Sequence, residues 1–175
     1  KSKATNCKKF TMNELIADVI DQMEQIYQGN GWIGVNFKKK VDGLSDTEFF
    51  LQTKDMHSIA EIVSHLTTWR LETILKVKTG KGSITDDDPS NWKSIAVLKQ
   101  QGKQEILLKH YESLLNLLNL LRQKNDSFLN EKYYDTDFQG HYPYSFLVQG
   151  MLHHDIYHLG QIGLLVKFLR SDSDK

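Results

Sequence analysis

The sequence has little cysteine, little proline and no long apolar run. Its 175 residues include one cysteine, Cys7, and two prolines. A single cysteine excludes an intrachain disulfide and fits a reducing compartment, so we expect a cytoplasmic protein. The scarcity of proline allows long uninterrupted helices. Because no apolar segment approaches the ~20 residues that a membrane helix needs, we expect no membrane association.

The sequence also lacks an excess of charge of either sign. Lysine plus arginine number 22, as do aspartate plus glutamate, so the formal net charge is zero. This balance argues against a surface that attracts nucleic acid or an anionic membrane as a whole. Apolar residues make up 39% of the chain and charged residues 25%, which is typical of a folded globular protein. The length suits one domain, residues 1–175, with a core at about 11–170 and flexible termini.

Apolar residues recur every three or four positions in four long stretches, and no alternating pattern of a strand competes with them. Thr11 and Ser58 are each followed three residues later by a glutamate, the pattern of a capping box. The sequence therefore predicts an all-α fold, a four-helix bundle with a short additional helix at 45–51. Its connections are longer than the ~2–8 residues of simple bundles, so at least one should cross the bundle end. The four predicted helices are residues 11–29, 58–79, 94–124 and 143–169.

A leucine-rich stripe marks the third predicted helix. Leu107, Tyr111, Leu114, Leu118 and Leu121 repeat at alternating spacings of four and three residues. Such a stripe suits the core of a helical bundle. The alternative is a seam between two copies of the chain through Leu107, Leu114 and Leu121.

Two of the seven histidines stand out by their spacing. His154 and His158 are four residues apart, so in a helix they lie on one face, and that face is apolar. His65 has the same apolar surroundings in the second predicted helix, whereas His153 should point elsewhere. Buried imidazoles need partners for their ring nitrogens, and three that converge make a plausible divalent metal site. We expect its affinity to weaken as the pH falls through ~6.5, where free imidazole gains a proton.

The segment His154–His158 also reads H-D-x-x-H, close to the H-E-x-x-H of zinc proteases. Those proteases take a third ligand downstream, but no Glu or His follows His158. A di-iron bundle needs two Glu-x-x-His repeats, and none occurs. Both interpretations are therefore disfavoured.

Two segments resemble the signatures of the DinB/YfiT-like superfamily. Residues 57–66 with Trp69 resemble its second-helix signature, and residues 150–162, which include H-x-G-Q, resemble its fourth-helix signature. The resemblance implies an up-down-down-up four-helix bundle. It also implies a three-histidine metal site, which falls on His65, His154 and His158. Many members are homodimers, and several branches use a metal to activate a low-molecular-weight thiol.

The sequence leaves the reaction and the metal open. Zinc, nickel and iron all suit three imidazoles. Gln161 could support the site or lie at its rim, and Glu61 could assist it or only cap its helix. We expect a divalent-metal-dependent enzyme, either a thiol-dependent S-transferase or a related transferase or hydrolase. Its partners would be a small-molecule substrate and a second copy of the chain, with no nucleic acid. The alternatives are a non-catalytic metal-binding bundle and a protein-interaction module.

Overall fold

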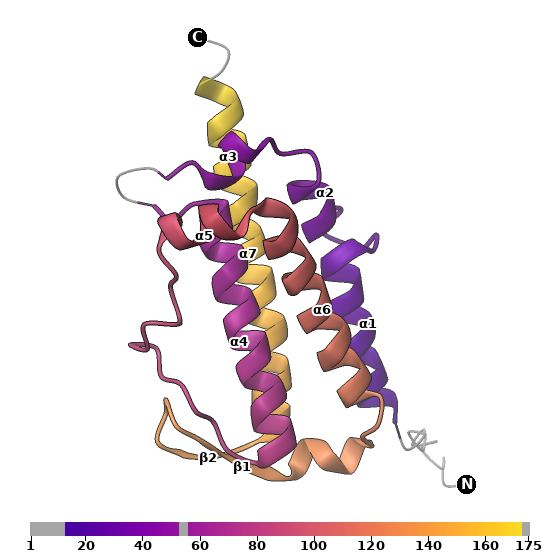
Figure 1. The fold of residues 1–175 in the computed structure, drawn as a ribbon. Coiled ribbons are helices and arrows are strands. Elements are labelled where there is room, and N and C mark those ends of the chain that lie inside the picture. Colours follow the sequence, from indigo (N-terminus) through magenta and orange to yellow (C-terminus); the bar gives the residue numbers. More distant parts are fainter. Residues whose placement is uncertain (1–12, 53–55, 173–175) are drawn as a thin grey trace, which may run out of the picture.

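The computed structural model describes residues 13–52 and 56–172, and four long helices in them form a bundle (Figure 1). Helices α1 and α7 run in one direction, and α4 and α6 run in the opposite one. Both α1 and α4 pack against α6 and α7, so α1 and α4 occupy diagonal corners. The expected up-down-down-up bundle is confirmed. The bounds are α1 Glu14–Gln28, α4 Ile59–Thr79, α6 Lys103–Leu121 and α7 Tyr144–Asp172.

Two short helices cover the end of the bundle at which α4 begins (Figure 1). The sequence predicted the helix α3, Asp46–Phe50, and the side chains of Ser45 and Glu48 cap it reciprocally. It did not predict α2, Phe37–Val41, whose first turn is capped by the Asn36 side chain. The predicted cap at Thr11 lies outside the described residues.

The prediction of one continuous third helix at 94–124 is wrong. This segment consists of α5, Ile95–Gln101, and α6, which are separated at Gly102. Gly102 has φ +82° and ψ 149°, a conformation that glycine adopts without steric cost and that no helix can contain. The chain therefore changes direction before α6 begins.

A β-hairpin precedes α7, although the sequence predicted no strands. Strand β1, Lys132–Asp135, pairs antiparallel with β2, Gly140–Pro143, after a short 3₁₀ turn, η1, at Asp126–Asn130. Pro143 is consequently the last strand residue rather than the first residue of a helix. The hairpin closes the end of the bundle at which α4 ends (Figure 1).

The leucine stripe of α6 belongs to the core. Leu114, Leu118 and Leu121 are buried among side chains of α1, α4 and α7, and Leu107 and Tyr111 are half-buried. A seam between two chains through Leu107, Leu114 and Leu121 is therefore wrong, because two of the three are already covered within the bundle. Within residues 13–52 and 56–172, no helix combines the length and the apolar character needed to cross a membrane.

Candidate metal centre

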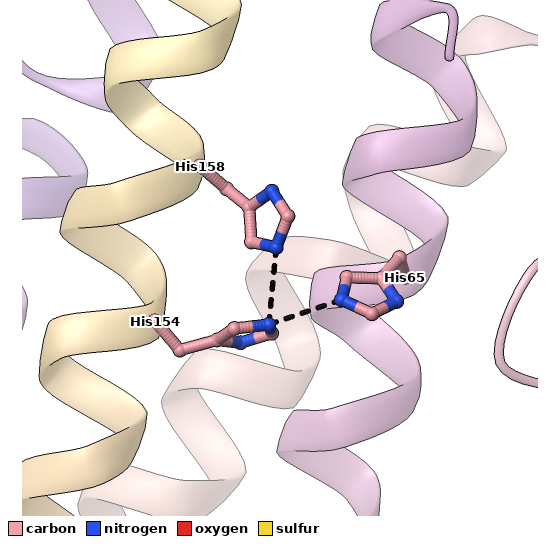
Figure 2. Close-up of side chains that lie close together, drawn as sticks. All are labelled: His65, His154 and His158. Atoms are coloured by element: carbon pink, nitrogen blue, oxygen red, sulfur yellow. Dashed lines mark hydrogen bonds between the residues drawn. The ribbon is translucent and has the colours of Figure 1, made fainter. Parts of the chain in front are cut away.

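Three histidines from two helices meet inside the bundle (Figure 2). His65 comes from α4, and His154 and His158 come from consecutive turns of α7. The Nε2 atom of His154 lies 3.0 Å from Nε2 of His65 and 3.1 Å from Nε2 of His158. His65 and His158 are buried, and His154 is half-buried. The structure thus brings together the three histidines that the sequence singled out, whereas His153 is exposed.

These ring nitrogens fit a shared divalent ion. A neutral imidazole carries one N–H, so a proton on His154 Nε2 can form a good hydrogen bond with only one of the two neighbouring Nε2 atoms. A cation could be coordinated by all three nitrogens. Two nitrogen ligands of one tetrahedral zinc are about 3.3 Å apart, close to the separations found here. Among the described residues, no other His, Cys, Asp or Glu joins this group, so the protein offers three ligands. Three protein ligands leave coordination positions open, as in catalytic rather than structural zinc sites.

Gln161 forms a hydrogen bond with the ring nitrogen of His158 that faces away from the other two histidines. Its Oε1 atom lies 2.7 Å from Nδ1 of His158, one turn further along α7. Because an amide oxygen only accepts, Nδ1 of His158 carries the proton and its Nε2 presents a lone pair to the centre. A hydrogen bond of this kind orients a metal-binding imidazole and fixes its tautomer.

Glu61 caps the start of α4. Its Oε2 atom accepts hydrogen bonds from the backbone N–H and the hydroxyl of Ser58, and its Oε1 accepts one from Gln52. These contacts complete the capping box that the sequence predicted. Both carboxylate oxygens are engaged at the helix end.

Sequence reasoning missed Trp92, which covers the ring of His65. The two rings are parallel to within 10°, with centroids 4.0 Å apart, and His57 stacks on the same indole at 3.8 Å. Trp92 lies in the loop before α5, where no periodic pattern indicates its orientation. The indole shields one face of a candidate ligand from water.

Burial keeps the three histidines neutral. It lowers the pKa of His65 to about 4, with a contribution from His158. It lowers the pKa of His154 to about 3, assisted by His158, His65 and Arg70. The pKa of His158 is also lowered, mainly by burial, although its hydrogen bond with Gln161 opposes the shift. The loss of metal that the sequence places near pH ~6.5 should therefore occur at lower pH.

We expect the metal-free protein to lose stability as the pH falls from about 7 to about 5. Unfolded histidine takes up a proton near pH ~6.5, whereas folded His65 and His154 do so only near 4 and 3. The unfolded state therefore binds more protons in this window. Each such histidine removes about 1.4 kcal/mol of unfolding free energy per pH unit below its unfolded pKa. Urea unfolding with a chelator present measures the slope, which His154→Ala should reduce; a flat profile would contradict the neutral cluster.

A buried ion pair adjoins the histidines. One Nη atom of Arg70, on α4, donates to both carboxylate oxygens of Asp155 at 2.9 Å, and the other donates to the His110 carbonyl and the Ser113 hydroxyl of α6. Burial raises the pKa of the Asp155 carboxyl, and the Arg70 guanidinium opposes that rise. Since Asp155 is committed to Arg70, it does not serve as the acidic residue of a zinc-protease motif.

A cavity of about 420 Å³ begins at His65 and His154. One face of α4 lines it with His65, Trp69, Thr73 and Lys76. Met151 and His154 of α7 line it beside α4, and the β-hairpin lines it as well. His65 and His154 thus border a space of the size that small-molecule ligands occupy in proteins.

Comparisons with known proteins agree with this architecture. The family model described as the DinB superfamily matches residues 35–162. Among solved structures, YfiT from Bacillus subtilis matches with a TM-score of 0.65 at 14% sequence identity, over 97% of this chain and 93% of that one. YfiT is described as a probable metal-dependent hydrolase with an unusual four-helix bundle topology. At this identity the likeness establishes the fold alone. A search of curated proteins found no match.

Proposed function

The chain belongs to the DinB superfamily, and from that premise we propose that it is a metal-dependent enzyme acting on a small molecule. His65, His154 and His158 would hold one divalent ion, with Gln161 orienting His158. Zinc, nickel and iron remain candidates, because three imidazoles suit each of them. Once bound, such an ion acidifies water towards a pKa of ~7 and deprotonates a coordinated thiol.

One observation supports an enzyme over a structural metal site. His65 and His154 line the cavity as well as meeting each other, so a ligand in the cavity can reach the centre. A structural zinc site is normally closed by a fourth protein ligand, whereas a catalytic one keeps a position open for water or substrate. The cavity is also a binding space next to the histidines, which a non-catalytic bundle does not need.

Two reaction types suit a cavity that ends at His65 and His154. Hydrolysis uses activated water, and this is the activity described as probable for YfiT. S-transfer from a low-molecular-weight thiol uses an activated sulfur instead. Both need a nucleophile generated at neutral pH, which this donor set supports. We propose these two reactions as the ones to assay.

The proposal is tested by metal content and activity on the same preparation. We expect about one divalent ion per chain by elemental analysis. We also expect turnover in a panel of esters, amides and thiol-acceptor electrophiles. A chelator should abolish that turnover, and the metal found by elemental analysis should restore it. Activity that persists in metal-free protein would refute the proposal, as would a chain that binds no ion.

Homodimer formation stays a prediction. Among the apolar residues between α1 and α2, Trp32 is fully exposed and Ile33 is 44% exposed, whereas Phe37 at the start of α2 is buried in the core. A second copy would have to use such exposed residues rather than the stripe of α6.

A further inference from the structure

We propose that the substrate of this site is an elongated molecule with an apolar body and an amine at the end remote from the histidines. This inference rests on the proposed function and adds the substrate class to it. It comes from the length, the walls and the charge of the cavity.

The cavity extends along α4 away from the metal centre. His65, Trp69, Thr73 and Lys76 line it, and they lie on one face of the helix because they are spaced by four, four and three residues. At 1.5 Å per residue, the interval from His65 to Lys76 corresponds to about 16 Å along the helix axis. A molecule with its reactive group at His65 can therefore place its other end beside the hairpin.

Between these two ends the walls are largely apolar. Trp69 of α4 faces the cavity together with Leu147 and Met151 of α7. Phe146 of α7 and Phe138 of the hairpin also line it, and both are large exposed side chains, at 45% and 57%. Their rings meet edge to face at 5.9 Å. Burying an apolar or aromatic body against them would be favourable by the hydrophobic effect.

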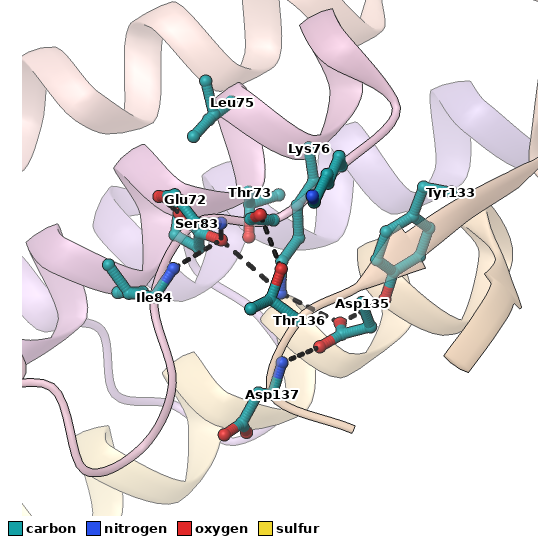
Figure 3. Close-up of polar contacts among 12 residues, drawn as sticks. Glu72, Thr73, Leu75, Lys76, Ser83, Ile84, Tyr133, Asp135, Thr136 and Asp137 are labelled. Carbon is teal, nitrogen blue, oxygen red and sulfur yellow. Dashed lines mark hydrogen bonds and ion pairs between the residues drawn. The ribbon is translucent and has the colours of Figure 1, made fainter. Parts of the chain in front are cut away.

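The lysine at the remote end does not make that end positive. Lys76 is buried, and its Nζ atom donates to Asp135 Oδ2 at 2.9 Å and lies 4.0 Å from Glu72 Oε1 (Figure 3). Asp135 also accepts hydrogen bonds from the Tyr133 hydroxyl and the Asp137 backbone N–H. The charge of Lys76 is therefore neutralised within the protein and is not offered to a substrate carboxylate.

Two further carboxylates give the cavity an excess of negative charge, and one of them, Asp137 of the hairpin, lies at its remote end. Asp86 and Asp137 also line the cavity, so one lysine and three aspartates give it a formal net charge of −2. Asp137 uses its Oδ1 atom to accept the backbone N–H of Asp86. Carboxylates beside aromatic rings, here with Phe138, form an environment that attracts an ammonium group and repels an anion. Asp137 lies in the turn of the hairpin and would hold the amine there, away from the cation that the histidines would hold.

Metal-free protein tests this inference independently of the metal. Phenylbutylamine, phenylbutanol and phenylbutyrate share one aromatic body and differ in terminal charge, and their affinities can be measured by calorimetry. We expect the amine to bind about tenfold more tightly than the carboxylate, with the alcohol between them. A chain that binds no metal but shows this order would refute the proposed function and leave the preference of the cavity intact.

Two glycines of α7 provide matched variants. Gly150 lines the cavity and Gly160 does not, and a Cβ atom added at either would meet open space. Gly150→Leu should fill the cavity and weaken the amine at least ~10-fold, whereas Gly160→Leu should leave its affinity unchanged. Both variants should fold, because leucine favours a helix over glycine. Asp137→Asn retains an oxygen acceptor for Asp86 and should weaken the amine about threefold without affecting the alcohol.

Each outcome bears on the inference. The expected order of probes, its loss in Gly150→Leu and its retention in Gly160→Leu would support it. Equal or tighter binding of the carboxylate would overturn the charge preference. Equal loss in both glycine variants would show that the probes bind outside this cavity and would overturn the assignment.

Discussion

His154→Ala should abolish stoichiometric metal binding, whereas His153→Ala should retain it. The Nε2 atom of His154 lies within 3.1 Å of the Nε2 atoms of both His65 and His158, so it occupies the middle of the group. Even removing a residue that only supports a metal ligand costs about 10–100-fold in affinity, so loss of this ligand should cost more than ~100-fold. His153 is adjacent in sequence but exposed, which makes it a matched control for the loss of one imidazole.

Metal content per chain at neutral pH measures this difference, and His65→Ala should behave like His154→Ala. All three variants should keep the helical circular dichroism spectrum, since the core packs without an ion. Retention of the ion by His154→Ala together with its loss from His153→Ala would show that the assigned face of α7 is wrong.

Periodicity predicted the long helices well because each buries a continuous apolar stripe. The limits of α4 follow from its capping box and from Gly80, and the predicted 58–79 agrees with Ile59–Thr79. Periodicity failed at Gly102, where apolar spacing continues although the backbone leaves the helical region. It also failed at the hairpin, whose strands of four residues are too short for alternation to be distinctive.

The metal centre was predictable to the extent that it depends on local spacing. His154 and His158 are fixed relative to each other by one helical turn, and the apolar surroundings of His65 in the second predicted helix indicated the third histidine, as did the family resemblance. Trp92 and the cavity depend on how loops and helices meet, which no local pattern encodes. Asp155 illustrates this limit, because its sequence context indicated a protease motif whereas its role depends on Arg70, 85 residues away.

Asp155→Ala should destabilise the protein by about 3–5 kcal/mol, the cost of breaking a buried ion pair. Arg70 is 2% exposed, so removal of the carboxylate would leave a guanidinium with little access to water. Its remaining hydrogen bonds, to the His110 carbonyl and the Ser113 hydroxyl, are to neutral groups. The same variant would loosen the contact between α4 and α7 that brings His65 to the other two histidines.

Urea unfolding of metal-free protein isolates this effect, with the exposed ion pair of Glu24 and Arg122 as a control. Those side chains are 41% and 44% exposed, so Glu24→Ala should cost no more than about 1 kcal/mol. Replacing both buried partners, as Arg70→Met with Asp155→Leu, should recover much of the stability lost in Asp155→Ala, because no uncompensated charge remains. Equal costs for Asp155→Ala and Glu24→Ala would contradict the buried pair. Failure of the double variant to recover would instead assign the loss to packing between α4 and α7.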